Sequence, residues 1–179
     1  SGIFTGELKN GITYGAPWWS NKCKIGFGTC LSFDGFNKYD GANKYVTMGN
    51  ILDSVFSGPD KKFTISAWIK NTGYPDNAVI LSKAGGGNEN ERQFYFRVLN
   101  GKLEFLWYGD LDGNSYRGTL GSTLINDSIW HHVIAVYDGG LNINSRVSLF
   151  VDGRKESAVI DYSLGEPSNI PSGQAPLTI

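Results

Sequence analysis

Hydrophobic and polar residues alternate along several short segments of the chain, which is the pattern of strands with one buried face. The segment FTISAWIK (63–70) places Phe, Ile and Ala side chains on one face and mostly polar ones on the other. Segments 78–83, 130–138 and 146–152 read as further strands, and only 50–56 suggests a short helix. Many short strands separated by turns predict an all-β fold, an antiparallel two-sheet sandwich of the jelly-roll type.

The best-defined element is a hairpin centred on Asn100-Gly101, because a type I′ turn needs positive φ at both central positions. A two-residue turn fixes the register and sets Arg97 opposite Glu104, a favourable pair of charges. The same register gathers six apolar side chains on the other face, which we expect to be buried: Phe94, Phe96, Val98, Leu103, Phe105 and Trp107.

The only two histidines, His131 and His132, are adjacent in the segment WHHVIAVYD. Neighbouring side chains of an extended strand point to opposite faces, so the two imidazoles do not readily share a metal or a substrate. Both faces of this segment are apolar further along. We therefore expect a central strand that is covered on both sides, with two structural histidines.

Composition narrows the class of protein. The 179 residues suit one domain with a real core, and 24 glycines with 24 aromatic residues (5 Trp, 9 Tyr and 10 Phe) favour strands and turns. A formal net charge of −1 without a basic cluster disfavours nucleic acid as a partner. No apolar run approaches the roughly 20 residues that span a membrane. Because the chain begins at Ser1 rather than Met, we expect it to be processed or cut from a longer protein.

The two cysteines lie in CKIGFGTC, as Cys23 and Cys30. Gly26 and Gly28 allow the chain to reverse between them, and a disulfide there would contribute about 2–3 kcal/mol by the loop-entropy model. The spacing does not fit a zinc knuckle. We favour the disulfide over two reduced thiols, and it would indicate an extracytoplasmic location.

Two groups of residues are candidates for binding. The loop GDLDGNS offers hard oxygen ligands for Ca²⁺ at Asp110, Asp112 and Asn114, although Asp-Gly is also simply a good turn. On the outer face of the predicted hairpin, aromatic and cationic side chains could hold a ligand unless a loop covers them: Tyr95, Arg97, Tyr108 and, from the following segment, Tyr116.

The common catalytic motifs are absent from the sequence. Glu89 and Glu91 resemble the paired carboxylates of glycosidases, but the surrounding Gly and Asn residues predict a solvated loop without the third acidic residue of sandwich-fold glucanases. We therefore expect a protein that is not an enzyme.

Several motifs, in order, resemble the laminin-G-like, concanavalin A-like domains of bacterial or archaeal surface or secreted proteins: CLSFDGFNKYDGANKYVTM, FTISAWIK, ILSK, IWHHVIAVYDGG and VSLFVDGRKE. The resemblance covers about residues 6–179 and implies one two-sheet domain, usually non-enzymatic, that binds glycans, proteins or surfaces, often with a structural Ca²⁺.

The ends of the chain differ from the family pattern, because neither the usual opening strand nor the usual closing strand is recognisable in SGIFTG and APLTI. Missing strands would leave open sheet edges. The sequence therefore favours an extracellular binding or adhesion module within a larger surface protein. The alternative is a subunit of an extracellular filament or pilus in which neighbouring chains supply the missing strands.

Overall fold

The computed structural model describes residues 7–9, 18–20, 23, 24, 26, 28, 30–33, 45–72, 77–85 and 91–179; for 7–9, 18–20 and Tyr162 it describes the backbone only. Glu89 lies outside the described residues. The elements, in chain order, are β1 (Glu7–Lys9), β2 (Trp18–Ser20), β3 (Cys30–Ser32), β4 (Tyr45–Thr47), α1 (Asp53–Phe56), β5 (Lys62–Lys70), β6 (Asn77–Ala84), β7 (Arg92–Leu99), β8 (Lys102–Tyr108), β9 (Tyr116–Leu124), β10 (Trp130–Asp138), η1 (Ile143–Ser145), β11 (Val147–Val151), β12 (Arg154–Lys155), β13 (Val159–Leu164) and β14 (Leu177–Thr178).

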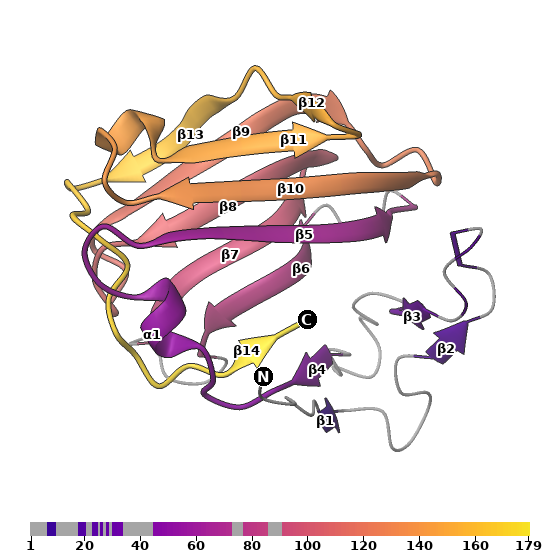
Figure 1. The fold of residues 1–179 in the computed structure, drawn as a ribbon, viewed down its shortest axis with the longest axis horizontal. Coiled ribbons are helices and arrows are strands. Elements are labelled where there is room, and N and C mark those ends of the chain that lie inside the picture. The colour runs from indigo at the N-terminus through magenta and orange to yellow at the C-terminus, as the bar shows by residue number, and fades with distance from the viewer. Residues whose placement is uncertain are drawn as a thin grey trace.

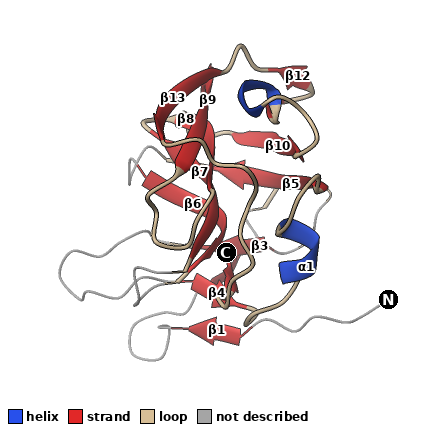
Figure 2. Cartoon of the chain, turned by 90° about the vertical axis from the view of Figure 1, so that its left-hand side faces the viewer, coloured by secondary structure: helices blue, strands red, loops and turns tan. Residues whose placement is uncertain are grey.

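Two antiparallel sheets form the layers of a sandwich (Figure 1). The larger sheet has the order β1-β4-β14-β6-β7-β8-β9-β13, and the smaller one has the order β12-β11-β10-β5. Figure 2 shows the two layers nearly edge-on, with α1 beside them. The predicted all-β sandwich is thus confirmed, as is the short helix expected at 50–56. None of the helices in the described part of the chain has the length and apolar character needed to cross a membrane.

The β7–β8 hairpin has the register expected from its two-residue turn, with Phe96 opposite Phe105 and Arg97 opposite Glu104. Asn100 and Gly101 have φ angles of 49° and 76°, as a type I′ turn requires. A Cβ on Gly101 would also lie 2.8 Å from the Asn126 side chain. The positive φ angles at Asn100 and Gly101 and the close approach of Asn126 to Gly101 therefore both favour glycine at this turn.

The core lies between the sheets and is rich in aromatic rings. Phe63 of β5 stacks on Tyr137 of β10 at 5.0 Å, and Phe94 stacks on Phe105 at 5.6 Å in the other sheet. Phe105 and Tyr137, with centroids 6.3 Å apart, join the two layers. All six hairpin residues expected in the core are at most 2% exposed: Phe94, Phe96, Val98, Leu103, Phe105 and Trp107.

β10 is a central strand, paired with β5 on one side and β11 on the other. His131 is buried and His132 is half-buried, so the alternation along the strand separates the two rings as expected. The expectation that both faces are covered is wrong. The outward side chains of Trp130, Ile134 and Val136 remain partly exposed, and no described element lies over this face (Figure 1).

The C-terminal segment is joined to the sandwich by a polar group that we call the Asp53 cluster: Asn50, Asp53, Lys83 and Gln93. The fully buried Lys83 ammonium donates to Asn50 Oδ1 and to the Ala175 carbonyl, both at 2.6 Å. Asp53 Oδ1 accepts hydrogen bonds from Gln93 Nε2 at 2.8 Å and from the Gly173 amide at 3.1 Å. These contacts hold the chain next to β14, which pairs with β4 and β6.

Candidate functional site

Three tyrosines from three adjacent strands form a continuous group on the outer face of the larger sheet. We call Tyr95, Tyr108 and Tyr116 the tyrosine row. The centroids of Tyr95 and Tyr108 lie 6.3 Å apart and those of Tyr108 and Tyr116 lie 5.9 Å apart, both in edge-to-face geometry. Tyr108 and Tyr116 are direct cross-strand partners. Antiparallel pairing therefore brings together residues that the sequence separates by up to 21 positions.

The row is most accessible at its two ends. Tyr108, in the middle, is only 8% exposed, whereas Tyr95 and Tyr116 are half-buried. The central ring consequently supports its neighbours, and the two outer rings are the ones that a ligand can reach.

Arginine side chains flank the row on two sides. The Arg97 guanidinium lies 5.8 Å from the Tyr95 ring centroid, and that of Arg92 lies 6.0 Å from the Tyr108 centroid. Such distances permit cation–π attraction. The surface therefore combines ring faces with N–H donors.

Arg97 also forms an ion pair with the fully buried Glu104 side chain across the hairpin. Burial raises the pKa of Glu104, and the adjacent Arg97 only partly opposes this effect. The predicted cross-strand pair is thus present, and it fixes the position of Arg97 beside Tyr95.

The loop proposed for Ca²⁺ lies directly after Tyr108 and leads into Tyr116. Asp110 Oδ1 accepts a hydrogen bond from the Asn114 amide at 2.9 Å, which closes the loop as a turn. Asp112 and Asn114 are exposed. Within the described ranges no group of three or more His, Cys, Asp or Glu side chains is arranged to hold a metal ion. Calcium binding by this loop stays a prediction.

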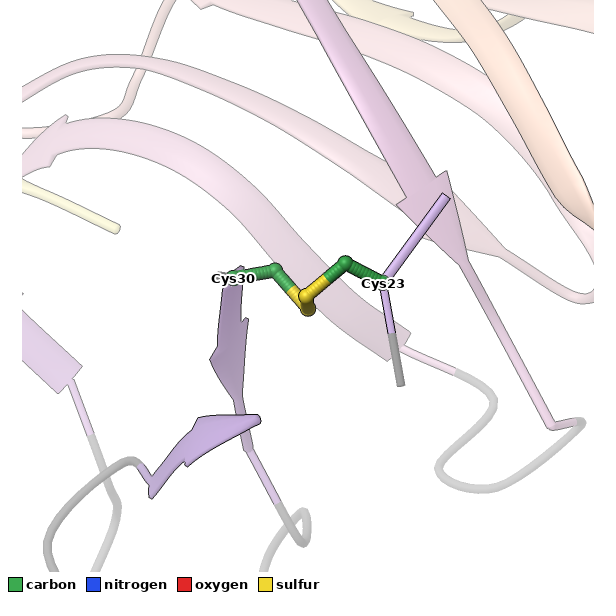
Figure 3. Close-up of a disulfide and its surroundings, with 2 residues drawn as sticks. All are labelled: Cys23 and Cys30. Carbon is green, nitrogen blue, oxygen red and sulfur yellow. A yellow bond between two sulfur atoms is a disulfide. The ribbon is translucent and has the colours of Figure 1, made fainter. Parts of the chain in front are cut away.

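Cys23 and Cys30 form a disulfide with Cα atoms 5.6 Å apart, as expected from the sequence (Figure 3). The neighbouring Lys24 ammonium lies 3.0 Å from the centroid of the Trp68 ring on β5. This contact joins the disulfide loop to the smaller sheet.

One polar group was not identified from the sequence. His131 lies between two carboxylates, with Nδ1 2.8 Å from Asp152 and Nε2 3.1 Å from Asp127. Burial alone would lower the His131 pKa, but the hydrogen bonds to Asp152 and Asp127 outweigh it and raise the pKa. Asp152 and Gly153 form the turn between β11 and β12, and nothing in the sequence indicates that this turn returns to His131.

A surface hollow of about 350 Å³ adjoins this group. One wall is Glu156, whose carboxylate accepts hydrogen bonds from the backbone and side chains of Ser122 and Thr123. Those bonds already occupy the carboxylate. The hollow is lined by Thr123, Val151, Asp152, Arg154 and Glu156.

The comparisons with known proteins agree with this architecture. The chain belongs to the concanavalin A-like lectin/glucanase superfamily, whose laminin-G family model matches residues 40–179. No curated protein sequence matches the chain.

Similar solved structures share the fold at low sequence identity. Mouse laminin alpha1 domains LG4-5 align with 18% identity and a TM-score of 0.47, covering 69% of this chain and 29% of that one. Botulinum neurotoxin type C, whose cell entry depends on interaction with two ganglioside molecules, aligns with 15% identity and a TM-score of 0.54 over 81% of this chain and 32% of that one.

The binding domain of botulinum neurotoxin DC, solved in complex with rat synaptotagmin II, gives 15% identity and a TM-score of 0.51, over 81% of this chain and 33% of that one. This chain therefore spans a third or less of the length of these solved chains.

Proposed function

We propose that the protein is a non-catalytic, extracellular binding module of a larger surface protein and that it recognises a glycan through the tyrosine row. The observation that carries the proposal is the assembly of Tyr95, Tyr108 and Tyr116 on one outer face, with Arg97 and Arg92 beside them. Aromatic faces pack against the C–H faces of sugar rings, and guanidinium and phenol groups donate to sugar hydroxyls.

Two further observations support the proposal, one for the extracellular location and one for the ligand. The Cys23–Cys30 disulfide is of a kind that persists in oxidising compartments. Membership of a superfamily that includes lectins fits a sugar ligand. The gangliosides and the synaptotagmin II named for the two neurotoxins are compatible with either a glycan or a protein as partner. At 15% identity, the choice of a glycan rests on the tyrosine row.

The test begins with a panel of immobilised glycans, followed by titration calorimetry with the best ligand. Because each accessible ring contributes about 0.5–1.5 kcal/mol, we expect Tyr95→Ala and Tyr116→Ala each to weaken binding by about 2- to 12-fold. Trp130→Leu removes an aromatic ring from the outer face of the other sheet and serves as the control, with unchanged affinity.

Equal binding by the wild type and both tyrosine variants would show that the ligand lies elsewhere. Release of reducing sugar from the bound glycan would contradict the non-catalytic assignment. Repeating the titration with added Ca²⁺ and with a chelator tests the proposed ion at Asp110, Asp112 and Asn114. If Ca²⁺ bound to this loop supports the tyrosine row, added Ca²⁺ should increase the affinity for the glycan, and Asp112→Asn should abolish that increase.

A further inference from the structure

Two arginines meet at one end of the space between the sheets. Arg117 is the direct cross-strand partner of Trp107, so both side chains lie on the inner face of the larger sheet. Arg146 comes just before β11 in the opposite sheet, and its guanidinium lies 5.4 Å from the Trp107 ring centroid. Trp107 is thus the common neighbour of two cations that are 29 positions apart in the sequence.

The described hydrogen-bond partners of both guanidinium groups are neutral. Arg117 donates to the side-chain oxygen of Asn144. Arg146 donates to the carbonyl of Leu141 at 3.0 Å and to that of Ser168. Arg146 also lies within hydrogen-bonding reach of the Tyr137 hydroxyl. A guanidinium carries five N–H donors, so these bonds leave further donors on each arginine.

Two of the remaining donors are buried. Arg117 is 8% exposed and Trp107 is fully buried, and neither Arg117 Nε nor Trp107 Nε1 has a hydrogen-bond partner among the described residues. A buried N–H without an acceptor is unfavourable, and a buried cation without a counter-charge is more so. The ring of Trp107 compensates the charge of Arg146 only in part, by cation–π attraction.

The surrounding described residues offer no counter-charge. Within the described ranges no carboxylate lies within ion-pair distance of Arg117 or Arg146, and the nearby Asp138 already pairs with Lys62 at 3.0 Å. Tyr137 stands beside this group, with its ring 5.5 Å from that of Trp107. Burial raises the pKa of the Tyr137 hydroxyl, the adjacent Arg146 only partly opposes this effect, and the hydroxyl is therefore neutral and able to donate.

We propose that Arg117, Arg146 and the indole N–H of Trp107 bind an oxyanion, either a free inorganic ion or the sulfate or carboxylate group of a larger ligand. A guanidinium matches two oxygens of such a group with parallel N–H bonds. Asn144 and Ser168, which accept hydrogen bonds from the two arginines, are exposed and Arg146 is half-buried, so the outer end of this group lies at the protein surface. It lies on the opposite face of the sheet from the tyrosine row and does not depend on the function proposed for that row.

The test uses the ¹H–¹⁵N spectrum of the folded protein. The indole N–H signal of Trp107 is assigned by its loss in Trp107→Phe, and sodium sulfate is then titrated against sodium chloride at equal ionic strength. We expect a saturable shift of the Trp107 signal with sulfate and no comparable shift of the other four indole signals. A shift that is linear, or shared by all five tryptophans, would overturn the proposal and leave bound water as the partner of these donors.

Matched variants locate the site. Arg146→Gln removes a partly exposed cation and should weaken sulfate binding about tenfold or more. Arg154→Gln makes the same change beyond the other end of β11 and should leave binding unchanged. If Arg146→Gln fails to fold, Arg146→Lys keeps the charge and loses the planar fork, and it should also weaken binding. Equal affinity in the wild type and the Arg146 variant would contradict the assignment.

A sulfated monosaccharide and glucuronate then distinguish the source of the oxyanion. Tighter binding of either sugar than of inorganic sulfate would make the site part of an acidic-glycan surface. Saturable binding of inorganic ions alone would make it a site for a free anion.

Discussion

His131 illustrates how a single side chain acquires its properties from the fold. Its ring contacts Asp127, four residues earlier, and Asp152, which lies in the β11–β12 turn. Asp152 Oδ1 also accepts the backbone N–H of His132 at 2.9 Å. When the imidazole is protonated, both ring nitrogens donate, and the imidazolium links two loops at one end of the smaller sheet.

Stability should therefore peak in mildly acidic solution. Since the His131 pKa is raised on folding, its contribution is fully present below the ordinary histidine pKa of about 6.5 and is lost as the pH rises through the raised value. Burial alone would raise the pKa of Asp152, but the hydrogen bonds that it accepts from His131 and the His132 amide outweigh burial and lower the pKa. The pKa of Asp127 is also lowered, chiefly by the hydrogen bond from the Ile129 amide. Their contributions are lost as the pH falls through those lowered values. Denaturant unfolding between pH 3 and 9 should show this maximum.

His131→Gln should remove the decline of stability on the alkaline side of the maximum and lower the free energy of unfolding near pH 6 by about 1 kcal/mol. His132→Gln is the matched control, because His132 bonds Ser66 on the opposite face of the strand. An unchanged pH profile in His131→Gln would show that this histidine does not produce the pH dependence.

At the scale of elements, the sequence predicts what local chemistry determines. The alternation along β7 places Tyr95 and Arg97 on one face, and the register fixed by the Asn100-Gly101 turn adds Glu104 and Tyr108 of β8 to it. The position of Arg117 and Arg146 on either side of Trp107 could not be predicted from the sequence, because it depends on how β9 and the start of β11, which belong to different sheets, face one another. The incomplete cover of the outer face of β10 could not be predicted either, since apolar residues on both faces of a strand do not reveal whether a second layer is present.

The Asp53 cluster should control how firmly the C-terminal strand is held. Burial lowers the pKa of Lys83, and the carboxylate of Asp53, 3.9 Å away, opposes this effect. Asp53→Ala would leave the Lys83 ammonium buried without that charge and the donors on Gln93 and Gly173 without their acceptor. We expect a loss of about 2 kcal/mol, less than for a fully buried pair, because Asp53 is 23% exposed.

Hydrogen exchange measures the local effect of Asp53→Ala. The amides of Leu177 and Ile179 donate to carbonyls of Gly49 and Val46, and they should exchange faster in the variant than those of β10. Asp112→Ala removes an exposed carboxylate and is the control. Uniform acceleration across β10 and β14 would instead indicate global destabilisation.

For the whole molecule, the main question is whether the sheet edges join other chains. β5 pairs with β10 along nine positions and has no partner on its other side among the described strands. Its first and last residues are the exposed Lys62 and Lys70. β13, one of the two edge strands of the larger sheet, is interrupted by a register shift between Ile160 and Ser163. Charged ends and irregular pairing both oppose strand addition.

We therefore expect the chain to remain a monomer of 19.6 kDa in sedimentation experiments across a wide concentration range. Lys70→Thr removes one of the charges that protect β5 and should increase association, whereas Lys102→Thr makes the same change on the interior strand β8 and should not. Polymers that form in the wild type without any glycan would contradict this expectation. They would instead favour a filament or pilus subunit, because open edges that pair between chains are what strand exchange requires.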